Sequence, residues 1–285
     1  MNDVNDEKLT IVNDVEFERI YACIKKDITE NRNSVSSPVG VVLGGQPGSG
    51  KRNIYEIFDE KYSDNVVRVD CDEFRRYHPH FLDLKDKYGE NDEYYTQPFV
   101  RKVLRRIVPE LSNEHYNFVF ESTLKNPDVS ISIKETIAPK GYSAILCVMA
   151  TSKEASWQGV VDRYKEQVAK GKPARMVPKE YHDLVVSNIC DSLDVVYKSG
   201  QMSNILIYNR QKECLYDMSK TPELNPTNIL YEQIHGREKI KSFSLKEENK
   251  GLCMKETQSD REKFQMREAS PFMKSNCKIK NDIER

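Results

Sequence analysis

The residues best suited to chemistry form a glycine-rich run that ends in lysine. Residues 45–51 fit the pattern G-x-x-x-x-G-K and follow an apolar stretch at residues 39–43. In this pattern, glycines let backbone N–H groups turn toward phosphate oxygens, and the next helix adds the positive end of its dipole. The residues predicted to bind a nucleotide are Gly45, Gln46, Pro47, Gly48, Ser49, Gly50, Lys51 and Arg52. We expect the lysine to bridge the β- and γ-phosphates; a glycine-rich turn without a ligand is the alternative.

Arg52 departs from the usual pattern of such a loop. This position normally carries Ser or Thr, whose hydroxyl group binds Mg²⁺, and arginine cannot ligate a cation. Three interpretations stay open. Water, phosphates and acidic residues alone would hold Mg²⁺, or Arg52 itself would offset phosphate charge, or the site would be catalytically weak.

Asp72 follows the second predicted strand, at residues 66–69. Ligands of open parallel sheets lie beyond the carboxyl ends of the strands, so this carboxylate is expected near the γ-phosphate. We predict that Asp72 accepts the proton of an attacking hydroxyl group and orients that group. Its alternative role is the N-cap of the next helix. Asp70 is the competing candidate, with a structural or Mg²⁺-linked role.

Three further charged residues complete the predicted site. Glu121 directly follows the third predicted strand, at residues 118–120, where a carboxylate needs a cation or hydrogen-bond donors and could hold Mg²⁺ or its water. Arg163 lies in a predicted helix, and Arg175 lies in the segment between two predicted helices. We predict that both arginines neutralise charge on a transferring phosphoryl group. A surface arginine is the alternative for each.

The elements that must position these residues alternate along the chain. Strands are expected at residues 39–43, 66–69, 118–120, 143–149 and 205–208, with an edge hairpin at 214–218. Helices are expected at residues 14–30, from about 50, and at 97–111, 129–138, 153–170 and 178–199. This alternation favours an α/β fold of the P-loop NTPase type, with a mostly parallel sheet flanked by helices.

The expected organisation has three parts. Residues 1–37 form an N-terminal helical extension and linker, and residues 38–235 form the kinase-like domain. Residues 236–285 form a polar, charged tail that is mobile or partly helical. Residues 237–285 contain 13 Lys or Arg and 9 Asp or Glu with few apolar residues.

The composition limits the classes of partner. The 285 residues include 44 Lys or Arg and 45 Asp or Glu, a net charge of -1, so a generally basic surface for nucleic acid is not expected. No apolar stretch approaches the roughly 20 residues of a membrane helix, and no signal peptide is evident. The seven cysteines are scattered without a Cys-x-x-Cys pair, which disfavours a disulfide framework or zinc site. We therefore expect a cytoplasmic protein without a nucleic-acid or membrane partner.

Taken together, these motifs resemble the zeta toxin family, the kinase half of epsilon/zeta-type toxin–antitoxin systems. The resemblance runs from about residue 38 to residue 218. Its main motifs are G-G-Q-P-G-S-G-K at 44–51, V-D-C-D-E-F-R-R-Y-H-P at 69–79, N-F-V-F-E-S-T at 117–123, D-R-Y at 162–164, A-R-M-V-P-K at 174–179 and L-I-Y-N-R at 206–210.

The resemblance implies a kinase that uses ATP and Mg²⁺ to phosphorylate the 3′-hydroxyl of the amino sugar in UDP-N-acetylglucosamine. A small helical antitoxin would be its partner. By the same resemblance, Lys51 is the phosphate-loop lysine and Asp72 is the base that activates the sugar hydroxyl. Glu121 and Thr123 line the substrate and metal side of the cleft, and the two arginines stabilise the transferring phosphoryl group.

Three positions depart from the family pattern. Arg52 replaces the hydroxyl residue, Arg105 stands near the place of an acidic substrate contact, and Lys125 stands where an arginine often follows Glu-x-Thr. Two alternative functions therefore stay open. One is another small-molecule P-loop kinase, and the other is a catalytically weak member that binds nucleotide or antitoxin.

Overall fold

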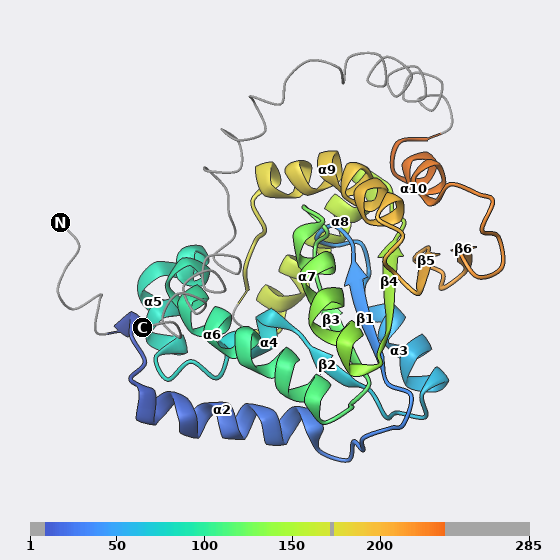
Figure 1. Cartoon of the computed structure of the whole chain (residues 1–285). Helices are drawn as coiled ribbons and strands as arrows, with labels where there is room; N and C mark the ends of the chain where they lie inside the picture. The colour runs from blue at the N-terminus through green and yellow to red at the C-terminus, as the bar shows by residue number, and fades with distance from the viewer. Residues whose placement is uncertain (1–8, 172–173, 237–285) are drawn as a thin grey trace, which may run out of the picture. The chain divides into compact units, whose positions relative to one another are not determined.

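A six-stranded sheet forms the centre of the molecule. The computed structural model of the chain describes residues 9–171 and 174–236 (Figure 1). Within them the strand order is β2-β3-β1-β4-β5-β6, and each neighbouring pair is parallel except the edge pair β5–β6. The strands are β1 (Val39–Gly44), β2 (Val67–Val69), β3 (Phe118–Glu121), β4 (Ser143–Met149), β5 (Asn204–Tyr208) and β6 (Cys214–Asp217).

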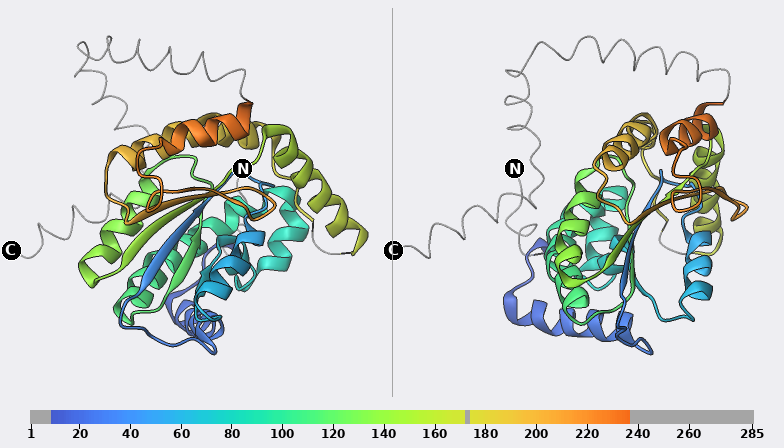
Figure 2. Two further views of the ribbon diagram at one scale, coloured as in Figure 1. Left: turned by 90° about the vertical axis from the view of Figure 1, so that its right-hand side faces the viewer. Right: turned by 45° about the vertical axis from the view of Figure 1, so that its right-hand side comes forward.

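Helices cover both faces of this sheet (Figure 2). The helices in the described part of the chain are α2 (Asp14–Thr29), α3 (Arg52–Lys61), α4 (Cys71–Arg75), α5 (Phe81–Tyr88), α6 (Asp92–Asn113), α7 (Asp128–Ile137), α8 (Lys153–Ala169), α9 (Lys179–Lys198) and α10 (Pro226–His235). Successive side chains of a strand point to opposite faces, so Val41 and Leu43 pack with α3 while Val42 packs with α6 and α7. The predicted mostly parallel sheet flanked by helices is confirmed.

Several element boundaries differ from the predicted ones. Strand β4 and the edge hairpin lie where the sequence indicated, but α6 begins at Asp92 rather than near Gln97. The first turns of α6 precede the regularly spaced apolar residues, and Pro98 and Pro109 both lie inside the helix. Helices α5 and α10 were not among the expected helices, and α4 was expected only in the alternative interpretation of Asp72. With five and eight residues, α4 and α5 have too few turns for a clear apolar period.

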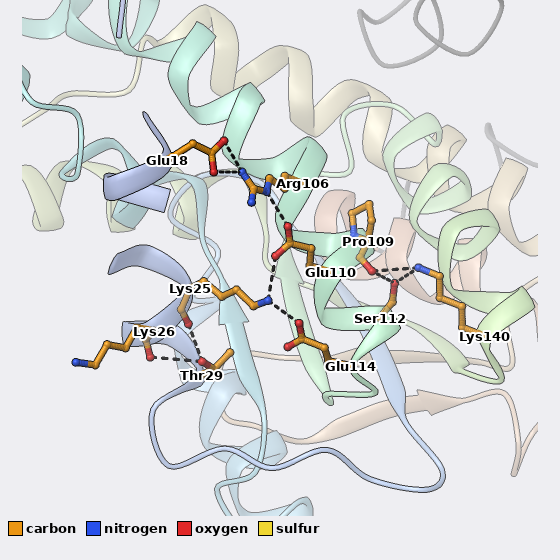
Figure 3. A network of polar contacts seen from close by, with 10 residues as sticks. All are labelled: Glu18, Lys25, Lys26, Thr29, Arg106, Pro109, Glu110, Ser112, Glu114 and Lys140. Atoms are coloured by element: carbon orange, nitrogen blue, oxygen red, sulfur yellow. Dashed lines mark hydrogen bonds and ion pairs between the residues drawn. The ribbon is translucent and has the colours of Figure 1, made fainter. Parts of the chain in front are cut away.

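Helix α2 packs against α6 and belongs to the main core. Phe17, Tyr21 and Ile24 are buried in the same cluster as the sheet and α6. Figure 3 shows the polar network beside this contact, in which Arg106 binds both carboxylate oxygens of Glu18 and also pairs with Glu110. The predicted division of the chain at residue 38 stays a prediction. The predicted tail lies outside the described residues apart from Gly236.

Candidate phosphate-binding loop and cleft

The register of three strands brings the predicted site together at one edge of the sheet. Leu43 of β1 pairs with Glu121 of β3, and Val69 of β2 pairs with Phe120 of β3. Because these strands are parallel, the glycine-rich loop, Asp70 and Glu121 all follow the same edge. The sequence predicted that these residues lie at the carboxyl ends of their strands. The order in which the strands pair decides which of them become neighbours.

The loop between β1 and α3 curls around the amino group of Lys51. The Lys51 Nζ atom donates hydrogen bonds to Gly45 O at 2.7 Å and Gln46 O at 3.3 Å. It also lies 3.6 Å from Glu121 Oε1. The amino group is buried, and desolvation lowers its pKa despite the opposing charge of Glu121. The loop thus holds a desolvated cation that an added negative charge would stabilise.

Gly48 allows this loop to pack against α8. A Cβ atom at this position would lie 2.1 Å from Ser156 O and 2.7 Å from Val160 N, and its φ of 73° is a left-handed conformation. Arg210 supports the same contact by donating to Gly48 O at 3.1 Å and Ala155 O at 3.3 Å. Arg210 was not predicted as a site residue, although it belongs to the L-I-Y-N-R motif at residues 206–210.

Two hydrogen bonds join the loop to Thr151, in the segment after β4. Gln46 Nε2 donates to Thr151 O at 2.6 Å, and Thr151 Oγ1 donates to Ser49 O at 2.9 Å. Ser49 Oγ is buried and makes no hydrogen bond within the described part of the chain. The loop is therefore anchored to the segment after β4 and keeps one hydroxyl group unpaired.

Asp70, rather than Asp72, caps α4. Asp70 Oδ1 accepts a hydrogen bond of 2.8 Å from Asp72 N, so the N-cap interpretation of Asp72 is wrong. Burial and the nearby charges of Glu121 and Asp72 raise the pKa of Asp70 to about 6. Glu121 itself accepts a hydrogen bond of 2.9 Å from Tyr55 Oη.

A cleft of about 700 Å³ opens beside Asp72. It is lined by Arg52, Asp72, Glu73, Arg75, Arg76, His78, Pro79, Phe81, Leu82, Asp83, Lys85, Asp92, Arg163, Gln167 and Arg175. Desolvation raises the pKa of Asp72, but the charges of Arg175, Arg75 and Arg163 outweigh it and hold the pKa below its usual value. Asp72 is consequently an ionised acceptor surrounded by guanidinium groups.

Both predicted arginines line this cleft. Arg163 is exposed on α8, and its positive charge acts on both Asp72 and Lys51. Arg175, in the segment before α9, lies 2.7 Å from Glu93 Oε2 on α6. Thr123 is partly buried in the loop after β3 and is not among the described residues that line the cleft. Its predicted role stays a prediction.

Arg75 is the main residue that sequence reasoning missed. Its side chain is only 6% exposed, and its Nε lies 3.5 Å from Asp72 Oδ1. The other guanidinium nitrogens bind groups on α6. The signal available was its place in the D-E-F-R-R run three residues after Asp72, which is one helical turn.

Arg52 begins α3 and turns toward solvent. Its side chain is 61% exposed, and Nη2 lies 3.7 Å from Glu73 Oε1 at the edge of the cleft. Among the described residues, no three His, Cys, Asp or Glu side chains form a cluster that could hold a metal ion. The role of Glu121 as a contact for Mg²⁺ stays a prediction. In the same part of the chain, no helix is long and apolar enough to cross a membrane.

The fold and the loop define an α/β protein of the P-loop type with a basic cleft at the carboxyl edge of its sheet. The Zeta toxin family model matches residues 23–221. The chain belongs to the zeta toxin family. This match extends the motif-based resemblance toward the N-terminus and includes the second half of α2.

Individual relatives agree with this assignment. The chain is 34% identical to Toxin PezT of Streptococcus pneumoniae over 224 residues, which covers 78% of this chain and 88% of that protein. It is 35% identical to Toxin zeta of Streptococcus agalactiae over 209 residues, or 73% of each chain. A solved structure from work on the PezAT chromosomal toxin–antitoxin system of S. pneumoniae superposes with a TM-score of 0.74 and 29% identity, covering 86% of this chain and 98% of that one.

Proposed function

We propose that this protein is an ATP-dependent kinase that phosphorylates the 3′-hydroxyl of the amino sugar in UDP-N-acetylglucosamine. We assign this activity to residues 38–235. The observation that carries the proposal is the position of Asp72 in a 700 Å³ cleft that Arg75, Arg163 and Arg175 also line. A cleft of this size and charge suits a nucleotide sugar with two phosphates, and family membership supports that acceptor.

The loop residues fit the phosphates of ATP. Lys51 is a desolvated cation, Gly48 leaves no room for a side chain, and the loop backbone precedes the N-terminus of α3. For Mg²⁺, the fit is limited to Glu121 with phosphate and water ligands, because Arg52 offers no hydroxyl group. Bound ATP would supply the phosphoryl group, and Mg²⁺ would neutralise part of its charge.

The protein's own residues would orient and deprotonate the acceptor. Asp72 accepts the proton of the sugar hydroxyl, and its lowered pKa keeps it ionised at neutral pH. Arg163, whose charge acts on both Lys51 and Asp72, stabilises the phosphoryl group between them. Arg175 adds a second positive charge from the segment before α9.

The test is transfer of phosphate to UDP-N-acetylglucosamine by the purified full-length protein with ATP and Mg²⁺. Mass spectrometry should detect a singly phosphorylated product, and NMR should place the phosphate on the 3′-oxygen of the sugar. Lys51→Ala should abolish transfer, while Lys61→Ala, an exposed lysine in the last turn of α3, should not. ATP consumption that ignores this acceptor would instead indicate another small-molecule kinase.

Arg52 supports a second candidate function, a nucleotide-binding member with little turnover. The residue lacks a hydroxyl group, and its side chain points to solvent. In that case calorimetry would detect ATP binding that Lys51→Ala removes, while the transfer assay would show no product even at saturating Mg²⁺.

We further propose that the chain is the toxin of a toxin–antitoxin pair with a small helical antitoxin. The support is the identity to Toxin PezT and the fold shared with the structure from the PezAT system. Expression of the wild-type chain should arrest bacterial growth, and Lys51→Ala should not. Equal growth of both strains at equal protein levels would contradict a toxic kinase.

A further inference from the structure

Glu93 on α6 joins two arginines that come from distant parts of the chain. Its Oε1 lies 2.9 Å from Arg75 Nη2, and its Oε2 lies 2.7 Å from Arg175 Nη2. Arg75 belongs to α4, whereas Arg175 belongs to the segment before α9. One carboxylate therefore links both sides of the cleft, through a charge-assisted hydrogen bond with Arg75 and an ion pair with Arg175.

Both terminal nitrogens of the Arg75 guanidinium donate hydrogen bonds to residues of α6. Nη2 also donates to Gln97 Oε1 at 2.6 Å, and Nη1 donates to Thr96 Oγ1 at 3.0 Å and to Glu93 O at 3.3 Å. Its Nε makes no hydrogen bond among the described residues and lies 3.5 Å from Asp72 Oδ1. A planar guanidinium with these partners has a defined orientation, so its Nε is held close to the Asp72 carboxylate.

We propose that Glu93 is a positioning residue, which holds Arg75 and Arg175 beside Asp72 before any ligand binds. This inference rests on the proposed function, because that function makes Asp72 the proton acceptor. Glu93 would act only through the two arginines. It would fix where their positive charges meet the acceptor hydroxyl and the phosphoryl group.

The proposal can be tested by whether the pKa of Asp72 rises or falls when the charge of Glu93 is removed. Asp72 is faced by Arg75 on its own helix, by Arg163 from α8 and by Arg175, with Asp70 and Glu73 as its acidic neighbours. If the arginines stayed in place, neutralising Glu93 would remove a negative charge and lower the pKa of Asp72. If Glu93 positions the arginines, neutralising it loosens Arg75 and releases Arg175 from its ion pair, and the pKa of Asp72 rises.

The experiment is a carboxyl ¹³C NMR titration of Asp72 in the full-length protein and in Glu93→Gln. We expect a higher pKa for Asp72 in the variant, and a lower or unchanged pKa would overturn the proposal. Glu18→Gln is the matched control, because Glu18 also pairs with an arginine of α6, Arg106 at 2.6 Å (Figure 3). Glu18 is not among the residues that line the cleft. It should leave the pKa of Asp72 unchanged.

Two further variants keep the proposal testable if Glu93→Gln fails to fold. Glu93→Asp keeps the charge but shortens the side chain, so the pKa of Asp72 should lie between those of the wild type and Glu93→Gln. Arg175→Gln should raise the pKa of Asp72, and adding Glu93→Gln to it should raise that pKa less than in the wild-type background. Additive effects of these two substitutions would contradict a link through Arg175.

Turnover provides an independent readout. With UDP-N-acetylglucosamine as acceptor, Glu93→Gln should lower kcat about tenfold or more with little change in KM for ATP. An unchanged or raised kcat would overturn the positioning role. Because the titration needs no catalysis, a wild type that fails to phosphorylate this acceptor would contradict the proposed function and leave the positioning test intact.

Discussion

Two aspartates at the start of α4 differ in what surrounds them. Asp70 accepts a hydrogen bond from the backbone of Asp72, and burial beside Glu121 raises its pKa to about 6. The Asp72 side chain is 52% exposed, and the neighbouring arginines keep its pKa low despite desolvation. One carboxyl group is therefore suited to support the helix, and the other is suited to accept a proton near neutral pH.

Asp72→Asn should separate catalysis from stability. Asn keeps the size of the side chain but cannot take a proton, so turnover should fall about a hundredfold or more while ATP affinity is retained. Because Asp70 provides the cap of α4, the melting temperature should change little. Asp86→Asn, an exposed position on α5, is the control for removal of a carboxylate. A large drop in melting temperature with normal turnover of the folded fraction would contradict this role.

Arg52→Thr should restore a hydroxyl group at the position that normally binds Mg²⁺. The side chain of Arg52 points to solvent and reaches Glu73 only at 3.7 Å, so little stability should be lost. We expect turnover to rise and the Mg²⁺ concentration for half-maximal rate to fall. Parallel Mg²⁺ titrations of both proteins measure this. Lower activity of the variant at every Mg²⁺ concentration would show that Arg52 itself holds phosphate charge.

At the scale of elements, the cap of α4 should make stability depend on pH. The pKa of Asp70 is raised from 3.8 to about 6, so its protonated form favours folding. This contribution is complete below pH 4 and is lost as the pH rises through 6. Asn does not titrate and still caps, so Asp70→Asn should be about 1–3 kcal/mol more stable than the wild type at pH 7.5, with equal stability near pH 4.

Urea unfolding of both proteins between pH 4 and pH 8 measures this difference. Asp86→Asn serves again as the control, because an exposed aspartate should show no such trend. A stability difference between Asp70→Asn and the wild type that stays constant across this range would show that burial does not raise the pKa of Asp70.

At the scale of the whole molecule, α2 should unfold together with the sheet. Phe17 is 1% exposed, and its ring contacts those of Tyr21 and Phe99, each with centroids 5.9 Å apart. Phe17→Ala should lower the free energy of unfolding by about 3–5 kcal/mol in a single transition. Val15→Ala, at a residue of α2 that is 67% exposed, should change it by less than about 0.5 kcal/mol. A separate early transition for α2 would show that this helix is an independent extension.

Local features of the chain were enough to predict the parallel sheet, the loop at residues 45–51, and the place of Asp72 and Glu121 at strand ends. These follow from apolar period and glycine spacing, which involve neighbours within a few residues. The choice of Asp70 over Asp72 as the cap is local and depends on the backbone geometry at the start of α4. Only the tertiary structure decided that Glu93 joins Arg75 to Arg175. Pairing between side chains far apart in sequence depends on how α4, α6 and the segment before α9 pack, and no local pattern encodes that packing.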